Sequence, residues 1–136
     1  MNSEGLILLT NNGNFSRYME LPKNSFERDY KVRVHGKINI KRLSSVEKGS
    51  KIDGIKYMPI KVSLGKTTGT NSWLTMKLNE GKNREIRKVC NFIGLEVNRL
   101  IRLSYGPFDL GDLKKEEIRE VSDTFLKNNF KDHFYL

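Results

Sequence analysis

Four cationic side chains stand within seven residues of this chain, in the segment 82–88. This segment follows a turn signal and opens a helical pattern. The first turn of a helix carries partial positive charge from unpaired backbone N–H groups, so added cations make a concentrated site for phosphate or carboxylate. Since the formal net charge is +9, we expect the phosphates of a nucleic acid. The candidate residues for binding this nucleic acid are Lys82, Asn83, Arg84 and Lys88. The alternative is a solvated helix face that Glu80 and Glu85 partly neutralise.

Two further side chains could act within a binding cleft. Arg87 follows Ile86, a residue of the expected apolar helix stripe, so its guanidinium is placed at the edge of the core. A charge held there needs a carboxylate or phosphate partner. Tyr30 lies on the apolar face of an alternating strand pattern. It is either a core tyrosine with a satisfied hydroxyl or a ring on which a nucleobase stacks.

Scattered strands and helices position these residues and predict an α+β fold. We expect a strand at 5–10 that is buried on both faces, and further strands at 29–36, 60–64, 74–78 and 97–103. Residues 65–71, rich in Gly, Thr and Lys, predict a loop. A helix is expected from about 84 to 93, with Asn83 as N-cap and Gly94 as its stop. Short helices are also expected at 15–19 and from about 122.

The bulk composition limits the function classes. A chain of 136 residues predicts one domain. Its pI near 9.7 favours nucleic acid or an anionic membrane surface as partner, and no basic amphipathic helix with a broad apolar face supports the membrane. We expect a cytoplasmic protein, because no apolar run approaches a bilayer span and no signal peptide is apparent. The single cysteine, Cys90, and the distant His35 and His133 offer no zinc-ligand spacing.

Several separate pieces of the chain together resemble the bacterial ribosomal-RNA pseudouridine synthases that modify small- and large-subunit rRNA. The matching pieces, in register, are residues 3–13, 29–36, 53–54, 80–87, 99–102, 106–107 and 110–113. The resemblance implies a mixed, mainly antiparallel sheet with flanking helices and an RNA cleft across it. It also implies the conversion of uridine to pseudouridine, in which the glycosidic bond is cleaved and the base is rejoined through carbon. It further implies that no metal or cofactor takes part.

The resemblance also implies residue roles. Tyr30 matches a tyrosine that packs on the flipped uracil, and Arg87 matches an arginine that pairs with the family's catalytic aspartate. Leu100 and Ile101 match an apolar stretch that lines the site. These roles agree with the chemistry, because the base must leave its stack before its glycosidic bond can be reached, and a bidentate arginine keeps a carboxylate ionised in a partly dry cleft.

One essential part of the pattern is missing. The family's aspartate belongs to a Gly-Arg-Leu-Asp sequence that would stand just before Met1, and the chain's own aspartates lack that context. They are Asp29, Asp53, Asp109, Asp112, Asp123 and Asp132. We therefore expect residues 1–136 to be the C-terminal part of a catalytic domain, without the aspartate strand and the N-terminal RNA-binding domain, and inactive alone. The alternative is a non-catalytic RNA-binding module or ribosome-assembly factor with the same fold.

Overall fold

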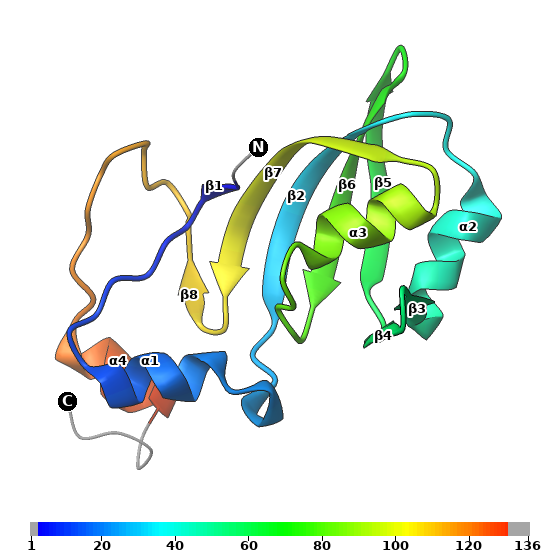
Figure 1. Cartoon of the computed structure of the whole chain (residues 1–136). Coiled ribbons are helices and arrows are strands. Elements are labelled where there is room, and N and C mark those ends of the chain that lie inside the picture. The colour runs from blue at the N-terminus through cyan, green and yellow to red at the C-terminus, as the bar shows by residue number, and fades with distance from the viewer. Residues whose placement is uncertain (1–2, 131–136) are drawn as a thin grey trace.

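A computed structural model describes residues 3–130 and shows one main sheet in the order β1-β7-β2-β6-β5, with β8 paired to β7. Figure 1 shows this sheet with α3 lying across it. The strands are β1 (Glu4–Gly5), β2 (Arg28–His35), β5 (Lys61–Thr68), β6 (Asn71–Leu78), β7 (Glu96–Tyr105) and β8 (Phe108–Asp109). Only β1 pairs in parallel among these described strands, with β7. The predicted α+β fold with a mixed, mainly antiparallel sheet is confirmed.

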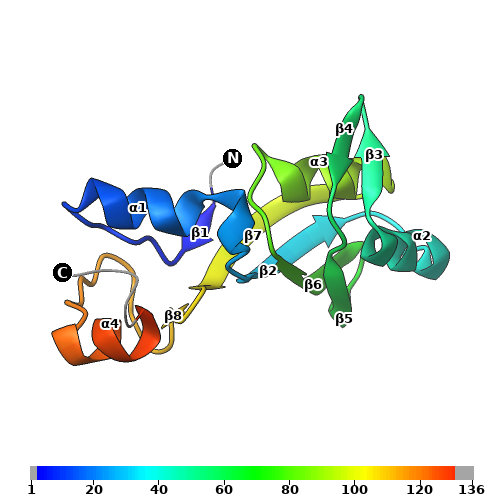
Figure 2. The same cartoon turned by 90° about the horizontal axis from the view of Figure 1, so that it is seen from below.

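The remaining elements surround the sheet. A small hairpin is formed by β3 (Ser50–Ile52) and β4 (Ile55–Tyr57). The helices are α1 (Gly13–Glu20), α2 (Ile40–Ser45), α3 (Glu85–Phe92) and α4 (Asp123–Phe130), with short 3₁₀ turns at η1 (Pro22–Asn24) and η2 (Val46–Lys48). Figure 2 shows α3 and the β3–β4 hairpin on the same side of the sheet, with α1 and α4 at its far end.

The main core lies between the sheet and α3. Alternation along β2 turns Val32 and Val34 inward, and both are fully buried. The apolar stripe predicted for α3 meets them, since Ile86, Val89 and Cys90 are all buried in the same cluster. The other face of β2, which carries Lys31 and Arg33, therefore points away from α3. The sheet therefore has two distinct surfaces, one covered by α3 and one that faces away from it.

A second core of aromatic side chains holds α1 and α4 against β8. Phe15 of α1 meets Phe130 of α4 edge-to-face with ring centroids 5.0 Å apart, and Phe108 packs on Phe130 at 5.7 Å. The helices predicted near residues 15 and 122 are confirmed. Side-chain caps begin both: Asn12 Oδ1 accepts from the N–H of Phe15, and Ser122 Oγ accepts from Phe125.

Two predictions about regular structure were wrong. The run 5–10 is not a strand buried on both faces: β1 ends at Gly5, and Ile7 and Leu9 are 71% and 77% exposed. Only its alternate residues Leu6 and Leu8 pack on the aromatic core. Residues 65–71 are not a loop either, because β5 runs on to Thr68, past an irregularity between Leu64 and Thr67. β-branched threonines favour a strand, and they outweigh the glycine at 65.

Candidate active site

The basic segment reaches α3 through an unusual helix start. The N-cap is Arg84, in the left-handed conformation at φ 53°, and not Asn83 as expected. The predicted Asn83 cap is wrong, because no side chain among residues 3–130 accepts a hydrogen bond from the first N–H groups of this helix. Instead Glu85, the first helical residue, reaches back to the loop, where its Oε1 accepts a hydrogen bond from the backbone N–H of Lys82 at 3.1 Å. At the other end Gly94 stops the helix at φ 85°, as predicted.

Two buried carboxyl groups organise the same loop. Glu80 and Glu85 are 7% and 3% exposed. Glu80 accepts from the backbone N–H of Met58 at 2.9 Å and pairs with the Lys82 ammonium. Burial opposes ionisation of Glu80, but Lys82, Met58 and Glu85 together lower its pKa. Burial, together with a hydrogen bond to and the charge of Glu80, raises the pKa of Glu85 to about 8. At neutral pH, therefore, Glu85 is protonated beside the ionised Glu80, and its Oε2 atom is buried without a hydrogen-bond partner among residues 3–130.

The predicted RNA-binding side chains differ in how free they are. Asn83 and Arg84 are exposed and Lys88 is half-buried. Lys82 is exposed as a residue, yet its ammonium pairs with Glu80 and lies 5.8 Å from the Tyr57 ring centroid. Lys82 thus helps to neutralise a buried carboxylate, whereas the Arg84 side chain has no hydrogen bond or ion pair among residues 3–130 and can reach an external anion.

Arg87 is half-buried on the sheet side of the basic segment. Its Nη2 atom is buried and has no hydrogen-bond partner among residues 3–130. Burial, followed by the positive charge of Arg84, lowers the pKa of the Arg87 guanidinium. Both effects favour an added negative charge beside it. None of the aspartates in the described part of the chain supplies that charge, and Asp132 lies outside the described residues, as do Met1 and Asn2.

Tyr30 lies on the same side of the sheet as α3. It packs against the main core, and its neighbours across the ladders are Met76 on β6 and Arg102 on β7. Arg102 donates from Nε to the Leu6 carbonyl at 3.0 Å. The sequence analysis did not identify Arg102 as a site residue. Only the register of β7 against β2, which pairs Arg102 with Tyr30, shows that it lies beside the site.

Arg28 is a second cation that the sequence analysis missed on this side. It is 7% exposed and donates from Nη2 to the Tyr105 hydroxyl at 2.9 Å, with its Cζ 4.6 Å from that ring's centroid. Its guanidinium also lies against Gly81, where an added Cβ would approach Arg28 Nη2 to 3.7 Å. Arg28 therefore ties the loop before α3 to the end of β7.

The two expected pocket-lining residues point to opposite sides. Leu100 pairs with Val32 and is buried in the main core beneath α3. Ile101 pairs with Lys31, and so it faces the other surface of the sheet. The structure therefore places Leu100, but not Ile101, on the side of Tyr30 and Arg87.

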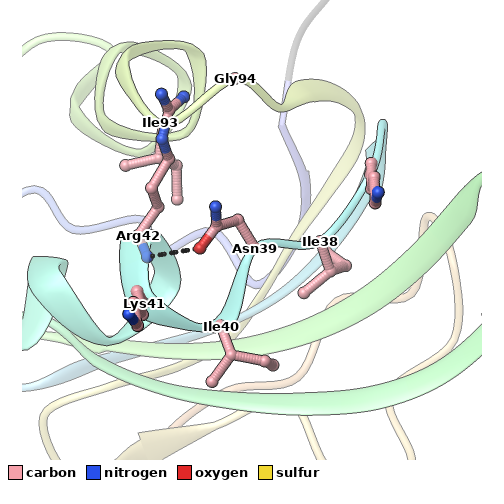
Figure 3. A pocket seen from close by; sticks show the side chains of 8 residues that line it. Ile38, Asn39, Ile40, Lys41, Arg42, Ile93 and Gly94 are labelled. Carbon is pink, nitrogen blue, oxygen red and sulfur yellow. Dashed lines mark hydrogen bonds between the residues drawn. The ribbon is translucent and has the colours of Figure 1, made fainter.

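A cavity of about 550 Å³ lies elsewhere, at the C-terminal end of α3. Figure 3 shows Arg42 reaching toward Ile93 and Gly94, with Asn39 accepting from the Arg42 backbone N–H at 3.2 Å. The cavity also takes in Lys37 and Lys41 but neither Tyr30 nor Arg87. Its lining joins three cations to Asn39, Gly94 and three isoleucines and includes no carboxyl or hydroxyl group, so the candidate active site stays with Tyr30 and Arg87.

The described residues contain neither a membrane-spanning helix nor a metal site. No helix within 3–130 is long and apolar enough to cross a membrane. Within the same range, no three His, Cys, Asp or Glu side chains gather closely enough to hold a metal ion.

Comparison with known proteins identifies the class. The sequence profile of the RNA pseudouridylate synthases matches residues 1–92, more than half of the chain. The chain belongs to this family. An uncharacterised RNA pseudouridine synthase of Rickettsia conorii is 46% identical over 129 residues, which are 95% of this chain and 56% of the relative. The ribosomal large subunit pseudouridine synthase B of Buchnera aphidicola (from Schizaphis graminum) is 35% identical over 93% of this chain and 51% of its own length.

A solved structure agrees with this assignment at the level of fold. The crystal structure of a pseudouridylate synthase superimposes with a TM-score of 0.79 at 22% identity, over 93% of this chain and 54% of the other. The chain thus spans about half the length of the curated relatives that it matches.

Proposed function

We propose that this chain is part of an enzyme that converts uridine to pseudouridine in ribosomal RNA. The observation that carries the proposal is the buried Nη2 of Arg87, which has no hydrogen-bond partner among residues 3–130. A buried guanidinium nitrogen without a partner is costly, and a carboxylate is the side chain that best relieves it. Family membership and the ribosomal RNA synthases among the relatives support the reaction and the substrate class.

Arg87 and Tyr30 have distinct roles in this proposal. Arg87 binds the catalytic aspartate, which residues outside 1–136 supply, and keeps it ionised against the cost of burial. Tyr30 packs against the extruded uracil at the edge of the main core. Leu100 contributes to the apolar floor beneath it. Ile101 is left out of this floor, since its side chain faces the other surface of the sheet.

The RNA backbone is held by the basic segment. The start of α3 offers hydrogen-bond donors from Asn83, Arg84 and Lys88. Lys82 can bind RNA only when its ammonium group is released from Glu80. These contacts are sequence-independent and weaken with salt. Ribosomal RNA as substrate favours a cytoplasmic protein, whereas a reaction without metal or cofactor is implied by the family resemblance alone.

The test compares two forms of the protein on one rRNA transcript. The 136-residue chain is expected to bind the transcript but to form no pseudouridine. A form extended upstream through the Gly-Arg-Leu-Asp sequence is expected to form it. Nucleoside chromatography after digestion measures the product. Turnover by the 136-residue chain would refute the roles assigned here. Binding without turnover by both forms would favour the alternative, a non-catalytic RNA-binding module or ribosome-assembly factor.

A further inference from the structure

The side of the sheet that faces away from α3 carries an aromatic ring among cations. We call it the Trp73 face; its central residues are Trp73, Lys31, Arg33 and Arg99. Arg33 is the register partner of both Trp73 on β6 and Arg99 on β7, so the three side chains stand in one row across three strands. Figure 2 shows no described helix or strand lying over the centre of this side.

The contacts in this row hold the cations around the indole. Lys31 Nζ lies 4.6 Å from the Trp73 ring centroid, and the guanidinium carbons of Arg33 and Arg99 lie 5.8 and 5.9 Å from it. Trp73 is half-buried and Lys31 is exposed. A lysine that covers a ring from solvent is held only weakly, and its flexible stem lets it move aside.

Polar partners orient Arg33 and Arg99, but only the partner of Arg99 is charged and neutralises it. Arg33 donates from Nε to Asn98 Oδ1, a neutral acceptor, at 2.6 Å; it makes no ion pair among residues 3–130, and Glu4 offsets its charge only from a distance. Arg99 makes a bidentate pair with Glu4, at 2.9 and 3.1 Å. The uncompensated charges at the centre of the face are therefore those of Lys31 and Arg33.

The rim of the Trp73 face adds further cations. Lys77 and Lys61 are register partners on the same side of β6 and β5. Asp29 lies 3.7 Å from Lys77 and partly offsets it, and Glu96 stands opposite His35 at the other edge. The face as a whole is positive, and its complement is a polyanion.

We propose that the Trp73 face is a second RNA-binding surface, on the opposite side of the sheet from Tyr30 and Arg87. A single-stranded segment of RNA stacks one base on Trp73, while Lys31 and Arg33 bind the flanking phosphates. Every base has a π-face, so stacking on an aromatic ring with cations beside it tolerates any sequence. A protein partner would need a matching acidic surface with an apolar centre, and a second copy of this positive chain would be repelled. RNA as the ligand rests on the proposed function; the location of the surface does not.

Trp73 is the only tryptophan of the chain, so its fluorescence reports directly on this face. The experiment titrates the 136-residue chain with a 12-nucleotide oligouridylate and follows both binding and indole emission. Stacking is expected to quench the emission as binding saturates. Trp73→Leu is expected to weaken binding about tenfold, and Trp73→Phe, which keeps a ring, to weaken it less.

The charge contribution is tested by salt dependence. Lys31→Ala combined with Arg33→Ala is expected to lower the slope of log K against log salt by about 1.4, that is about 0.7 for each phosphate contact on a single strand. Lys127→Ala, on the exposed side of α4, is the matched control and should leave the slope unchanged. Circular dichroism and thermal melts identify any variant that fails to fold.

Three results would overturn this inference. The first is saturable binding of the oligouridylate with no change in Trp73 emission. The second is unchanged affinity and salt slope in folded Trp73→Leu and in the double variant. The third is a concentration-dependent emission shift without RNA, which would assign the face to self-association. None of these results depends on pseudouridine formation, so failure here and failure of the proposed enzyme are separate outcomes.

Discussion

The two sides of the sheet use positive charge in different ways. On the α3 side, the guanidinium groups of Arg28 and Arg87 are partly or fully buried. Arg28 donates to the Tyr105 hydroxyl, whereas Arg87 Nη2 has no hydrogen-bond partner among the described residues. On the Trp73 face, Lys31 and Arg33 stay near solvent around a ring. A buried cation demands one partner in one place, whereas a solvated cation binds many anions weakly. The first arrangement suits a reactive centre and the second a general hold on RNA.

The largest expected effect comes from removing the buried cation. Arg87→Ala, in the form that contains the aspartate, should lower pseudouridine formation by at least about 100-fold, because the carboxylate loses a partner worth roughly 3–5 kcal/mol. Rates on the rRNA transcript measure this. Arg84→Ala removes a neighbouring exposed charge and serves as control. Equal losses in the two variants would mean that burial does not distinguish Arg87.

Tyr30 tests whether the α3 side also provides a base-stacking ring. Tyr30→Ala should weaken target binding by about 1–3 kcal/mol, the value of one base on an aromatic ring, while Tyr30→Phe keeps the ring and most of the affinity. Filter binding of the rRNA transcript compares the two. If Tyr30→Phe loses as much as Tyr30→Ala, the hydroxyl rather than the ring is what the RNA needs.

Glu85 tests the buried carboxyl pair by pH. Its pKa is about 8 in the folded chain against an ordinary value of 4.5. Between these values the folded state binds more protons than the unfolded one. The stability it contributes is therefore complete below about pH 4.5 and is lost as the pH rises through about 8.

Glu85→Gln keeps a donor toward Glu80 without the ionisable proton. We expect it to raise the free energy of unfolding at pH 8 by about 1–2 kcal/mol and to flatten the decline between pH 5 and 8. Urea melts across this range measure both. Exposed Glu20→Gln is the control. A variant as pH-dependent as the parent chain would show that Glu85 is ionised in the fold.

The smallest effect is expected from the solvated cations of the basic segment. Lys88→Ala should lower the salt slope of RNA binding by about one unit and change stability little. Lys82→Ala should change the slope less but cost some stability, because its ammonium neutralises Glu80. Equal changes of slope in the two variants would show that Lys82 leaves Glu80 when RNA binds.

Local pattern predicted most of the regular structure. The alternation of Tyr30, Val32 and Val34 and the stripe on α3 depend on which residues repeat at the period of a strand or helix, so the sequence shows them directly. The run 5–10 could not be predicted in this way. An apolar run predicts that some of its side chains are buried. Whether one or both of its faces are covered depends on segments that are distant in sequence.

The same limit applies to the individual side chains of the site. The sequence by itself determined the candidates, because Arg87 is one residue from a core position and Tyr30 lies on an apolar strand face. Only the tertiary structure decided that Asn83 does not cap α3, that Lys82 is paired and that Leu100 and Ile101 face opposite ways. Residue type and period are local properties of the chain. Register and ion pairing arise only when segments far apart in sequence meet.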